Sequence, residues 1–308
     1  MFVVCGEALF DVFLAGETST GLSLDARLGG SPFNVAVGLA RMGQPVSLLT
    51  QVSRGFLGER LMRALQAEGV DTRTVRRSHA PTTLSLVGVD ERGLPSYAFY
   101  GEGCADRLLT PDALATLPAG VRALQFGSYA TVTGPTAATQ RLLIEREHER
   151  LLIAYDPNIR LNVEPSLAVW REHIAWMLPR THLLKVSDED LQLAWPGRAP
   201  ADFAAEALAQ GVRWVVVTRG GEGAVSWMTQ GRTDAPPVRV NVVDTVGAGD
   251  SFQAGLLTWL AEHEALSADA ISALTPAQVR DALGFAMRAA AITCSRRGAD
   301  LPRRAEIA

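Results

Sequence analysis

The chain has 308 residues, of which 47% are hydrophobic and 20% are charged, enough to bury one large core with room for a small accessory element. The net charge of −4 argues against binding to nucleic acid or an anionic membrane surface. The three cysteines fit neither a zinc site nor a disulfide framework, and no apolar run approaches a membrane span. Because no secretory signal pattern is present either, we expect a cytoplasmic protein with a single domain, residues 1–308.

The start of the chain predicts a buried strand followed by an acidic residue. Residues 2–5 are apolar, which is typical of a central strand. Asp11 follows soon after this run, and open α/β sheets bind ligands beyond the carboxyl ends of their strands. Asp11 is therefore a candidate ligand contact, and a solvated turn residue is the alternative.

A helix preceded by two glycines is predicted next. Gly29 and Gly30 permit close approach of the backbone to a ligand. Ser31 can cap the helix, and the proline that follows suits its first turn. Asn34 lies one turn further on and offers both a donor and an acceptor to a hydroxyl group. A capped helix with a purely structural role is the alternative.

Two segments predict a small exposed sheet. Residues 12–28 show no helical period, and residues 82–89 and 96–100 alternate apolar and polar side chains around a turn-rich loop. We expect these strands to form one lid, of about residues 12–28 and 82–102, inserted in the single domain.

Strands and helices alternate through the rest of the chain. This order predicts an α/β fold with a doubly wound, mostly parallel sheet flanked by helices and joined by right-handed crossovers. The predicted strands are 46–52, 123–127, 151–155, 183–186, 213–218 and 238–243. The predicted helices are 56–69, 135–149, 166–177, a short one from Ser187, 252–260 and 276–297.

The most informative stretch runs from Asp244 to Phe252, with the sequence Asp-Thr-Val-Gly-Ala-Gly-Asp-Ser-Phe. The backbone amides of residues 247–250 lie at the start of a predicted helix, where free N–H groups and the helix dipole favour an anion. Asp250 places a carboxylate within that site. Such a group is useful where a hydroxyl must lose a proton as a phosphoryl group arrives, and a plain helix cap is the alternative.

This stretch resembles the C-terminal signature of the ribokinase-like (PfkB) carbohydrate kinases, Asp-Thr-x-Gly-Ala-Gly-Asp-x-Phe. The resemblance extends from Gly6 to about Pro302 and is strongest to bacterial fructokinases. It implies that Asp250 is the catalytic base and that the anion hole is formed by the amides of Gly247, Ala248, Gly249 and Asp250.

The same resemblance implies where the sugar binds. In the family, residues at the positions of Asp11, Gly30 and Asn34 hold sugar hydroxyls. The stretch from Tyr97 to Asp106 is similar to one that lines the sugar pocket in fructokinases, and Asp-Pro-Asn-Ile-Arg at 156–160 is similar to another family motif. The implied sugar contacts are Asp11, Gly29, Gly30, Asn34, Tyr97, Phe99, Asn158 and Arg160. Packing within the sheet is the alternative for the two aromatic residues, and a plain turn is the alternative for residues 156–160.

The resemblance implies ATP and Mg²⁺ as cofactors. The phosphates and ribose are expected at Lys185, Ser187, Thr218, Gly220, Gly223 and Gly249. Ser187 and Asp190 stand where the family usually has Asn and Glu, so the shorter Asp190 is expected to place Mg²⁺ through water, and the neighbouring Glu189 is the other candidate for this role. Helix capping by Ser187 and a simple hairpin turn at 218–223 are the alternatives.

A potassium site is also implied. The last predicted helix leads into a loop at 294–300 that is similar to the terminal loop of the family. Backbone carbonyls of such a loop, together with an Asp at the position of Asp244, bind K⁺ there. The implied positions are Asp244, Val246, Thr293 and Gly298.

We therefore expect an ATP-dependent sugar kinase, with fructose as the leading acceptor and a homodimer formed through the lid. A 2-keto-3-deoxygluconate kinase, or a ribose or nucleoside kinase, is the alternative within the family. A catalytically inactive sugar sensor is the non-enzyme alternative. The chain lacks the glycine fingerprint of a dinucleotide-binding dehydrogenase and the Gly-x-x-x-x-Gly-Lys-Ser/Thr loop of a P-loop kinase.

Overall fold

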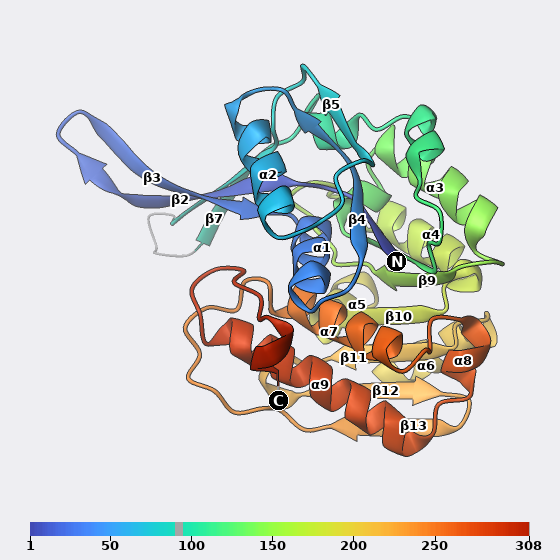
Figure 1. Cartoon of the computed structure of the whole chain (residues 1–308). Helices are drawn as coiled ribbons and strands as arrows, with labels where there is room; N and C mark the ends of the chain where they lie inside the picture. The colour runs from blue at the N-terminus through green and yellow to red at the C-terminus, as the bar shows by residue number, and fades with distance from the viewer. Residues whose placement is uncertain (90–94, 308) are drawn as a thin grey trace.

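A nine-stranded sheet forms the centre of the computed structural model, which describes residues 1–89 and 95–307 (Figure 1). Its strand order is β13-β12-β11-β10-β9-β8-β1-β4-β5. The bounds are β1 Phe2–Cys5, β4 Val46–Ser53, β5 Val75–Ser78, β8 Ala123–Gly127, β9 Leu152–Asp156, β10 Leu183–Ser187, β11 Trp214–Thr218, β12 Ala224–Met228 and β13 Gly231–Ala235.

The connections of this sheet confirm the prediction of a doubly wound fold. All neighbouring strands from β5 to β11 pair in parallel, whereas β12 pairs antiparallel with both β11 and β13. The chain goes outward from β1 to β4 and β5, then returns to β8 on the other side of β1. The strand order therefore reverses between β1 and β8, and ligands bind at the carboxyl ends of strands around such a point.

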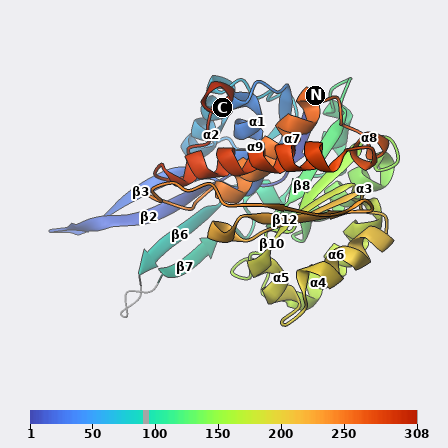
Figure 2. The ribbon, with the colours of Figure 1, turned by 90° about the horizontal axis from the view of Figure 1, so that it is seen from below.

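Helices cover both faces of the sheet (Figure 2). One face carries α1 Ser31–Arg41, α2 Phe56–Ala67, α7 Ala248–Glu262, α8 Ala268–Ser272 and α9 Pro276–Cys294. The other face carries α3 Thr136–Glu147, α4 Leu167–Met177, α5 Asp188–Ala194 and α6 Pro200–Ala209. Each layer of helices buries its own apolar cluster against the sheet, as expected for parallel strands covered on both sides.

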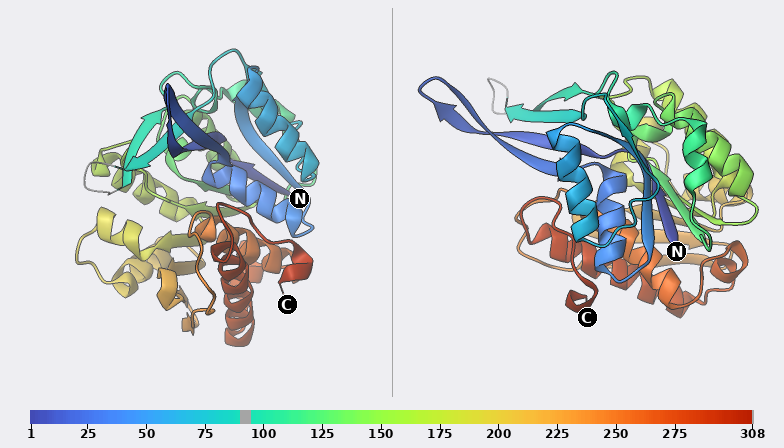
Figure 3. Two further views of the ribbon diagram at one scale, coloured as in Figure 1. Left: turned by 90° about the vertical axis from the view of Figure 1, so that its left-hand side faces the viewer. Right: turned by 45° about the horizontal axis from the view of Figure 1, so that its top comes forward.

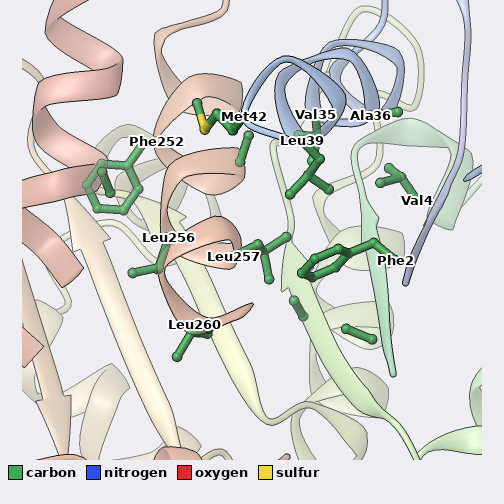
Figure 4. Packing of buried hydrophobic residues seen from close by; sticks show 14 of the residues in the cluster. Phe2, Val4, Val35, Ala36, Leu39, Met42, Phe252, Leu256, Leu257 and Leu260 are labelled. Carbon is green, nitrogen blue, oxygen red and sulfur yellow. The ribbon is translucent and has the colours of Figure 1, made fainter. Parts of the chain in front are cut away.

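Small residues let the helices around α7 pack closely. Leu256, Leu257 and Leu260 lie along the buried α7, and its neighbour α1 contributes Val35 and Leu39 to the same cluster (Figure 4). A Cβ atom on Gly38 of α1 would lie only 2.8 Å from the Cβ of Ala254. This crossing fixes α1 against the start of α7, and both helix N-termini belong to the site described below.

A second sheet projects from the body (Figure 3). Its strand order is β3-β2-β6-β7, with bounds β2 Leu9–Thr18, β3 Gly21–Gly29, β6 Leu84–Val89 and β7 Pro95–Tyr100. The long β2–β3 hairpin extends away from the main sheet in Figure 3. These strands match the segments expected to form the lid, apart from residues 90–94, which lie outside the described residues.

The structure corrects several expectations about secondary structure. Residues 238–243 form no strand; instead the backbone amides of Val243 and Asp244 both donate to the carbonyl of Cys294 at the end of α9. Asp11 lies within β2 rather than in a turn after β1. The strands β5, β12 and β13 and the helices α6 and α8 were not among the elements predicted from the sequence.

Candidate active site

The carboxyl group of Asp250 is held by two donors from another helix. Gly247 takes a left-handed conformation with φ 79°, and α7 starts at the next residue, so Asp250 lies in the first turn. The Ser31 hydroxyl donates to its Oδ1 at 2.6 Å, and the Asn34 amide donates to its Oδ2 at 2.8 Å. The predicted capping role of Ser31 is therefore wrong, because Ser31 is the first residue of α1 and its side chain bonds Asp250 instead.

Burial makes Asp250 a better base than an exposed aspartate. The pKa of Asp250 is raised by desolvation, while hydrogen bonds from Ser31 and Asn34 and the positive charge of Lys185 lower it. Proton transfer is most effective when the pKa of the base approaches the working pH. The site therefore combines a carboxylate of increased basicity with fixed orientation.

Two glycines bring the backbone close to the acidic side chains at this end of the sheet. A Cβ atom on Gly29 would lie 2.3 Å from Oδ2 of Asp11, and one on Gly30 would lie 2.9 Å from the carbonyl oxygen of Glu7. Gly30 also has φ 101°, which side chains rarely permit. Burial is the main cause of the raised pKa of Asp11, and the negative charge of Asp250 raises it further. Asp11, both glycines and Asn34 therefore gather around Asp250, as the sequence predicted.

A buried ion pair lies beside the anion hole. Asp156 ends β9 and Lys185 lies in β10, and Lys185 Nζ donates to Asp156 Oδ2 at 2.7 Å. The same Nζ is 3.1 Å from where a Cβ on Gly249 would stand, so the ammonium group faces the start of α7. Sequence reasoning gave Lys185 a phosphate-binding role but missed Asp156, because nothing in the local pattern couples residues on neighbouring strands.

Asp190 lies close to this pair at the start of α5. Its Oδ1 accepts the backbone N–H of Ile159 at 3.1 Å, and its own N–H donates to Ser187 Oγ at 3.0 Å. Ser187 thus caps α5, which was the alternative considered for it. Burial first, and then the charge of Asp156, raise the pKa of Asp190 to about 6. The hydrogen bond from Ile159 ties the motif at 156–160 to α5.

The carboxyl groups of Asp156 and Asp190 fit a magnesium ion that arrives with a nucleotide. Among the residues that the structure describes, Oδ1 of Asp156 is buried and has no hydrogen-bond partner. Within residues 1–89 and 95–307 no group of three or more His, Cys, Asp or Glu side chains forms a metal cage. Magnesium bound to phosphates keeps several waters and needs only one or two carboxylates. These two aspartates meet that requirement.

The loop at 156–160 brings a positive charge to the site. The charge of Arg160 lowers the pKa of Asp11, Glu7 and Asp190, so its guanidinium lies within electrostatic reach of all three. Asn158 in the same loop has φ 41°, a conformation that Asn tolerates better than most residues. The positive charge of Arg160 therefore acts both on the predicted sugar contact Asp11 and on Asp190.

An aromatic cluster joins β7 of the small sheet to the segment that follows β8. The ring of Phe99 meets that of Tyr129 edge-on at 5.3 Å, and the guanidinium of Arg107 packs over both rings. Tyr129 also donates to the buried Asp106 at 2.7 Å. Phe99 thus has a packing role in this structure. The backbone of Tyr97 belongs to β7, but its side chain lies outside the described residues.

The glycine-rich turn after β11 forms a tight hairpin. Thr218 pairs with Ser187 across β10 and β11, so the turn lies beside the start of α5. Gly220 and Gly223 have φ 49° and 90°, and a Cβ on Gly223 would lie 2.3 Å from the carbonyl oxygen of Ala235. The backbone of residues 218–223 is thus the hairpin turn that was the alternative to ATP binding. The turn lies at the same edge of the sheet as Ser187, so Thr218, Gly220 and Gly223 remain candidates for ATP binding.

The predicted potassium loop is tied to the start of α7. Asp244 Oδ1 accepts the N–H of Val246 at 3.1 Å, and Oδ2 accepts the N–H of Gly298 at 2.8 Å. The hydroxyls of Thr293 and Ser251 form a buried hydrogen bond that joins α9 to α7. The four predicted positions therefore come together, and they support the turn that carries Gly247.

The structure places one further acidic group that sequence reasoning left without a role. Glu7 follows β1 at the point where the strand order reverses, and it is only 1% exposed. Burial raises its pKa to about 8, against a hydrogen bond with Ser128. Glu7 packs beneath Gly30, so it supports the backbone of the predicted sugar contact.

Comparison with known proteins agrees with this geometry. The model of the pfkB family carbohydrate kinases matches residues 1–306. A fructokinase from Rhizobium leguminosarum bv. trifolii is 34% identical over 283 residues, which cover 91% of this chain and 86% of that protein. The probable fructokinase-6, chloroplastic, of Arabidopsis thaliana is 32% identical over 310 residues, covering 97% of this chain and 78% of the relative.

Solved structures share the fold over almost the whole chain. A fructokinase with bound ATP from Xylella fastidiosa has a TM-score of 0.89 at 24% identity, covering 99% of this chain and 96% of that one. An uncharacterized sugar kinase from Pyrococcus horikoshii in complex with ATP has a TM-score of 0.79 at 26% identity, again covering 99% and 96%.

These likenesses decide between the classes that the sequence left open. Membrane-crossing helices of sufficient length and apolarity are not found in the described part of the chain. The family match, the relatives above 30% identity and the ribokinase-like architecture point to one activity, ATP-dependent phosphorylation of a sugar. The chain belongs to the pfkB family of carbohydrate kinases.

Proposed function

We propose that this sugar kinase is a fructokinase and that Asp250 is its catalytic base. The observation that carries the role of Asp250 is its position at the start of α7, with both carboxyl oxygens held by Ser31 and Asn34 of α1. Fructose is supported by the relative from Rhizobium leguminosarum bv. trifolii, which is named a fructokinase. It is also supported by a structure from Vibrio cholerae O395 described as a fructokinase in fructose, ADP and calcium ion bound form, with a TM-score of 0.80.

The proposed reaction is an in-line transfer between two bound substrates. The sugar lies against Asp11, Gly29, Gly30 and Asn34, below the lid strands that carry Tyr97 and Phe99. The acceptor hydroxyl loses its proton to Asp250, and its oxygen attacks the γ-phosphorus of ATP as the bond to ADP breaks. The amides of Gly247, Ala248, Gly249 and Asp250 face the transferred group. Positioning and charge neutralisation supply most of the acceleration in such a reaction.

The ATP phosphates extend from the anion hole along the carboxyl ends of β10 and β11. Lys185, Ser187 and the turn with Thr218, Gly220 and Gly223 line that path. Magnesium, when bound with ATP, neutralises phosphate charge, and Asp190 and Asp156 are the carboxylates that would hold it through water. Potassium at the loop of Asp244, Val246, Thr293 and Gly298 would stiffen the turn before α7.

The experiment that tests this function is ADP release with Mg-ATP against fructose, tagatose, ribose, 2-keto-3-deoxygluconate and adenosine, with and without K⁺. The expected result is the highest kcat/KM with fructose and faster turnover when K⁺ is present. A higher kcat/KM with another acceptor would overturn the assignment of fructose. No turnover with any acceptor, together with intact ATP binding, would favour the sugar-sensor alternative.

A 2-keto-3-deoxygluconate kinase is the second candidate, and Arg160 is the observation that favours it. A sugar acid needs a cation near the sugar contacts, and the charge of Arg160 reaches Asp11 and Glu7. Arg160→Gln should lower kcat/KM for the acid far more than for fructose, because only the acid has a carboxylate to pair with Arg160. Equal losses on both sugars would remove Arg160 as a selectivity determinant.

We also propose a cytoplasmic homodimer formed through the lid. Three free cysteines, two of them buried, suit a reducing compartment. One face of the β2–β3 hairpin carries Leu14, Leu22 and Leu24, whose exposed fractions are 43%, 63% and 53%. Exposed apolar side chains in one row support a contact with a second copy of the chain.

A further inference from the structure

Lys185 is the only lysine in a chain whose 29 Lys and Arg residues are otherwise all arginine. Its side chain is also among the most buried basic groups, with 6% exposed. Arg and Lys differ in that Arg presents a wide planar fork, whereas Lys presents a compact ammonium group that forms three hydrogen bonds from one point. A chain that uses Arg everywhere else and Lys here points to a site where only the compact cation fits.

The surroundings of this ammonium group are unusual for a structural ion pair. Its partner Asp156 has a side chain only 5% exposed, and Oδ1 of that carboxylate has no hydrogen-bond partner in the described ranges 1–89 and 95–307. Removing two charges from water is costly unless their remaining polar atoms are satisfied. Within the described part of the chain, one oxygen of Asp156 therefore lacks a partner, and the bond from Lys185 Nζ to Asp156 uses one of the three ammonium protons.

The pair also stands between the two other acidic groups of the site. The charge of Asp156 acts on both Asp250 and Asp190, and so does the opposite charge of Lys185. Lys185 Nζ is 3.1 Å from where a Cβ on Gly249 would lie, which places it at the mouth of the anion hole. The ammonium group thus faces the position where a phosphoryl group would pass from ATP to the sugar.

We propose that Lys185 is a catalytic residue that neutralises the charge on the transferred phosphoryl oxygens, and that Asp156 is a positioning residue that holds Lys185 there. This rests on the proposed function, since it assumes that phosphoryl transfer occurs between the anion hole and Asp250. Lys185 gives up no proton and forms no covalent bond. The acceptor proton goes to Asp250, the new P–O bond forms on the sugar, and the electron pair of the broken P–O bond stays on ADP.

This arrangement gives different expectations for the two residues. Lys185→Met removes the charge, so kcat should fall by about 10²–10³-fold, while KM for fructose and for ATP changes by less than about five-fold. Lys185→Arg keeps the charge but cannot present it from one point, and kcat should still fall at least about ten-fold. A near-normal kcat in either variant would overturn the role of Lys185.

The role of Asp156 is tested by combining substitutions. With Mg²⁺ at saturating concentration, so that weaker metal binding does not limit the rate, Asp156→Asn should lower kcat by about 10–100-fold in the chain that has Lys185 and should have no further effect on kcat in Lys185→Met. Asp156→Glu keeps the carboxylate and should recover part of the lost rate. If Asp156→Asn lowers kcat by the same factor with and without Lys185, then Asp156 does not act through the lysine.

Folding is controlled within the same set of variants. Asp156→Asn leaves a buried ammonium group unpaired and can fail to fold, but the double variant Asp156→Asn/Lys185→Met carries neither charge. Comparing it with Lys185→Met at saturating Mg²⁺ keeps the test decisive, since equal kcat values support the proposal and a lower kcat in the double variant contradicts it. Asp250→Asn distinguishes a failure of the proposed function from a failure of this inference. Near-normal turnover in Asp250→Asn would contradict Asp250 as the base. Loss of turnover in Asp250→Asn, together with normal turnover in Lys185→Met, would contradict only the role of Lys185.

Discussion

At the scale of single residues, the site depends on one carboxylate whose two oxygens are held from α1. Asp250→Asn keeps the size and most of the hydrogen bonds of the side chain but removes the base. We expect kcat to fall by about 10²–10⁴-fold while ATP binding, measured by calorimetry, stays within a few-fold of the parent. Asp269→Asn, in the first turn of α8 and exposed, is the control and should leave kcat unchanged. Comparable kcat values for the two variants would contradict the assignment of Asp250.

Glu7 makes stability depend on pH. Burial raises its pKa in the folded state to about 8, above an ordinary value of 4.5. Because the folded protein holds the proton of Glu7 more tightly than the unfolded chain does, this proton stabilises the fold. The stabilisation is complete below pH 4.5 and is lost as the pH rises through 8. Because the side chain in Glu7→Gln stays neutral at every pH, the Tm of the variant minus the Tm of the parent should increase between pH 5 and pH 9. Parallel Tm profiles for the two proteins would show that Glu7 ionises normally.

Site residues that share one continuous motif could be predicted from the sequence, whereas contacts between residues far apart in the sequence could not. Asp250 and the anion-hole glycines belong to one continuous motif, and Gly30 and Asn34 to another. The bond from Ser31 to Asp250 joins residues 219 positions apart, and the Lys185–Asp156 pair joins neighbouring strands. No local pattern encodes such pairs, because the fold alone brings their atoms together.

At the scale of elements, long periodic segments and strong turn signals were predictable. The helices α1 and α7 have caps or glycines at their starts and apolar faces throughout. The segment 238–243 looked like a strand because valines recur in it, yet Val242 and Val243 are more than 60% exposed and pair with no strand. Alternating valines favour an extended backbone, but only a neighbour with free hydrogen-bonding groups makes a strand.

The crossing of α1 and α7 gives a stability prediction with a matched control. A Cβ atom on Gly38 would lie 2.5 Å from a methyl carbon of Leu301 and 2.8 Å from Ala254, whereas one on Gly284 of α9 meets only the end of a flexible arginine at 3.4 Å. Gly38→Ala should therefore destabilise the fold by about 1–3 kcal/mol through overpacking. Gly284→Ala should stabilise it by about 0.4–1 kcal/mol, because alanine restricts the unfolded chain. Urea unfolding of both variants measures the change in unfolding free energy, which should be a loss for Gly38→Ala and a gain for Gly284→Ala. A gain for both variants would show that α1 can move away from α7.

At the scale of the whole molecule, the projecting hairpin separates two surfaces. Side chains alternate along β2 and β3, so Leu14, Leu22 and Leu24 share one face. Asp11, Phe13 and Arg27 belong to the opposite face, and the guanidinium of Arg27 lies 5.0 Å over the ring of Phe13. Because Asp11 is one of the proposed sugar contacts, we infer that the face with Asp11 is directed toward the site and that the leucine face is left for a partner.

The proposed dimer follows from that division. The strand β3 lies at the edge of the small sheet, so its unpaired backbone groups and exposed leucines are available together to a second copy of the chain. We expect light scattering to give a dimer for the parent and a monomer for Leu22→Glu combined with Leu24→Glu, since four buried carboxylates per interface would oppose association. Leu142→Glu, on α3 and 48% exposed, adds a charge away from the lid and should remain dimeric. If the variant with Leu22→Glu and Leu24→Glu is still a dimer, the interface lies elsewhere on the molecule. If the parent protein is a monomer, the leucine face does not mediate dimerisation.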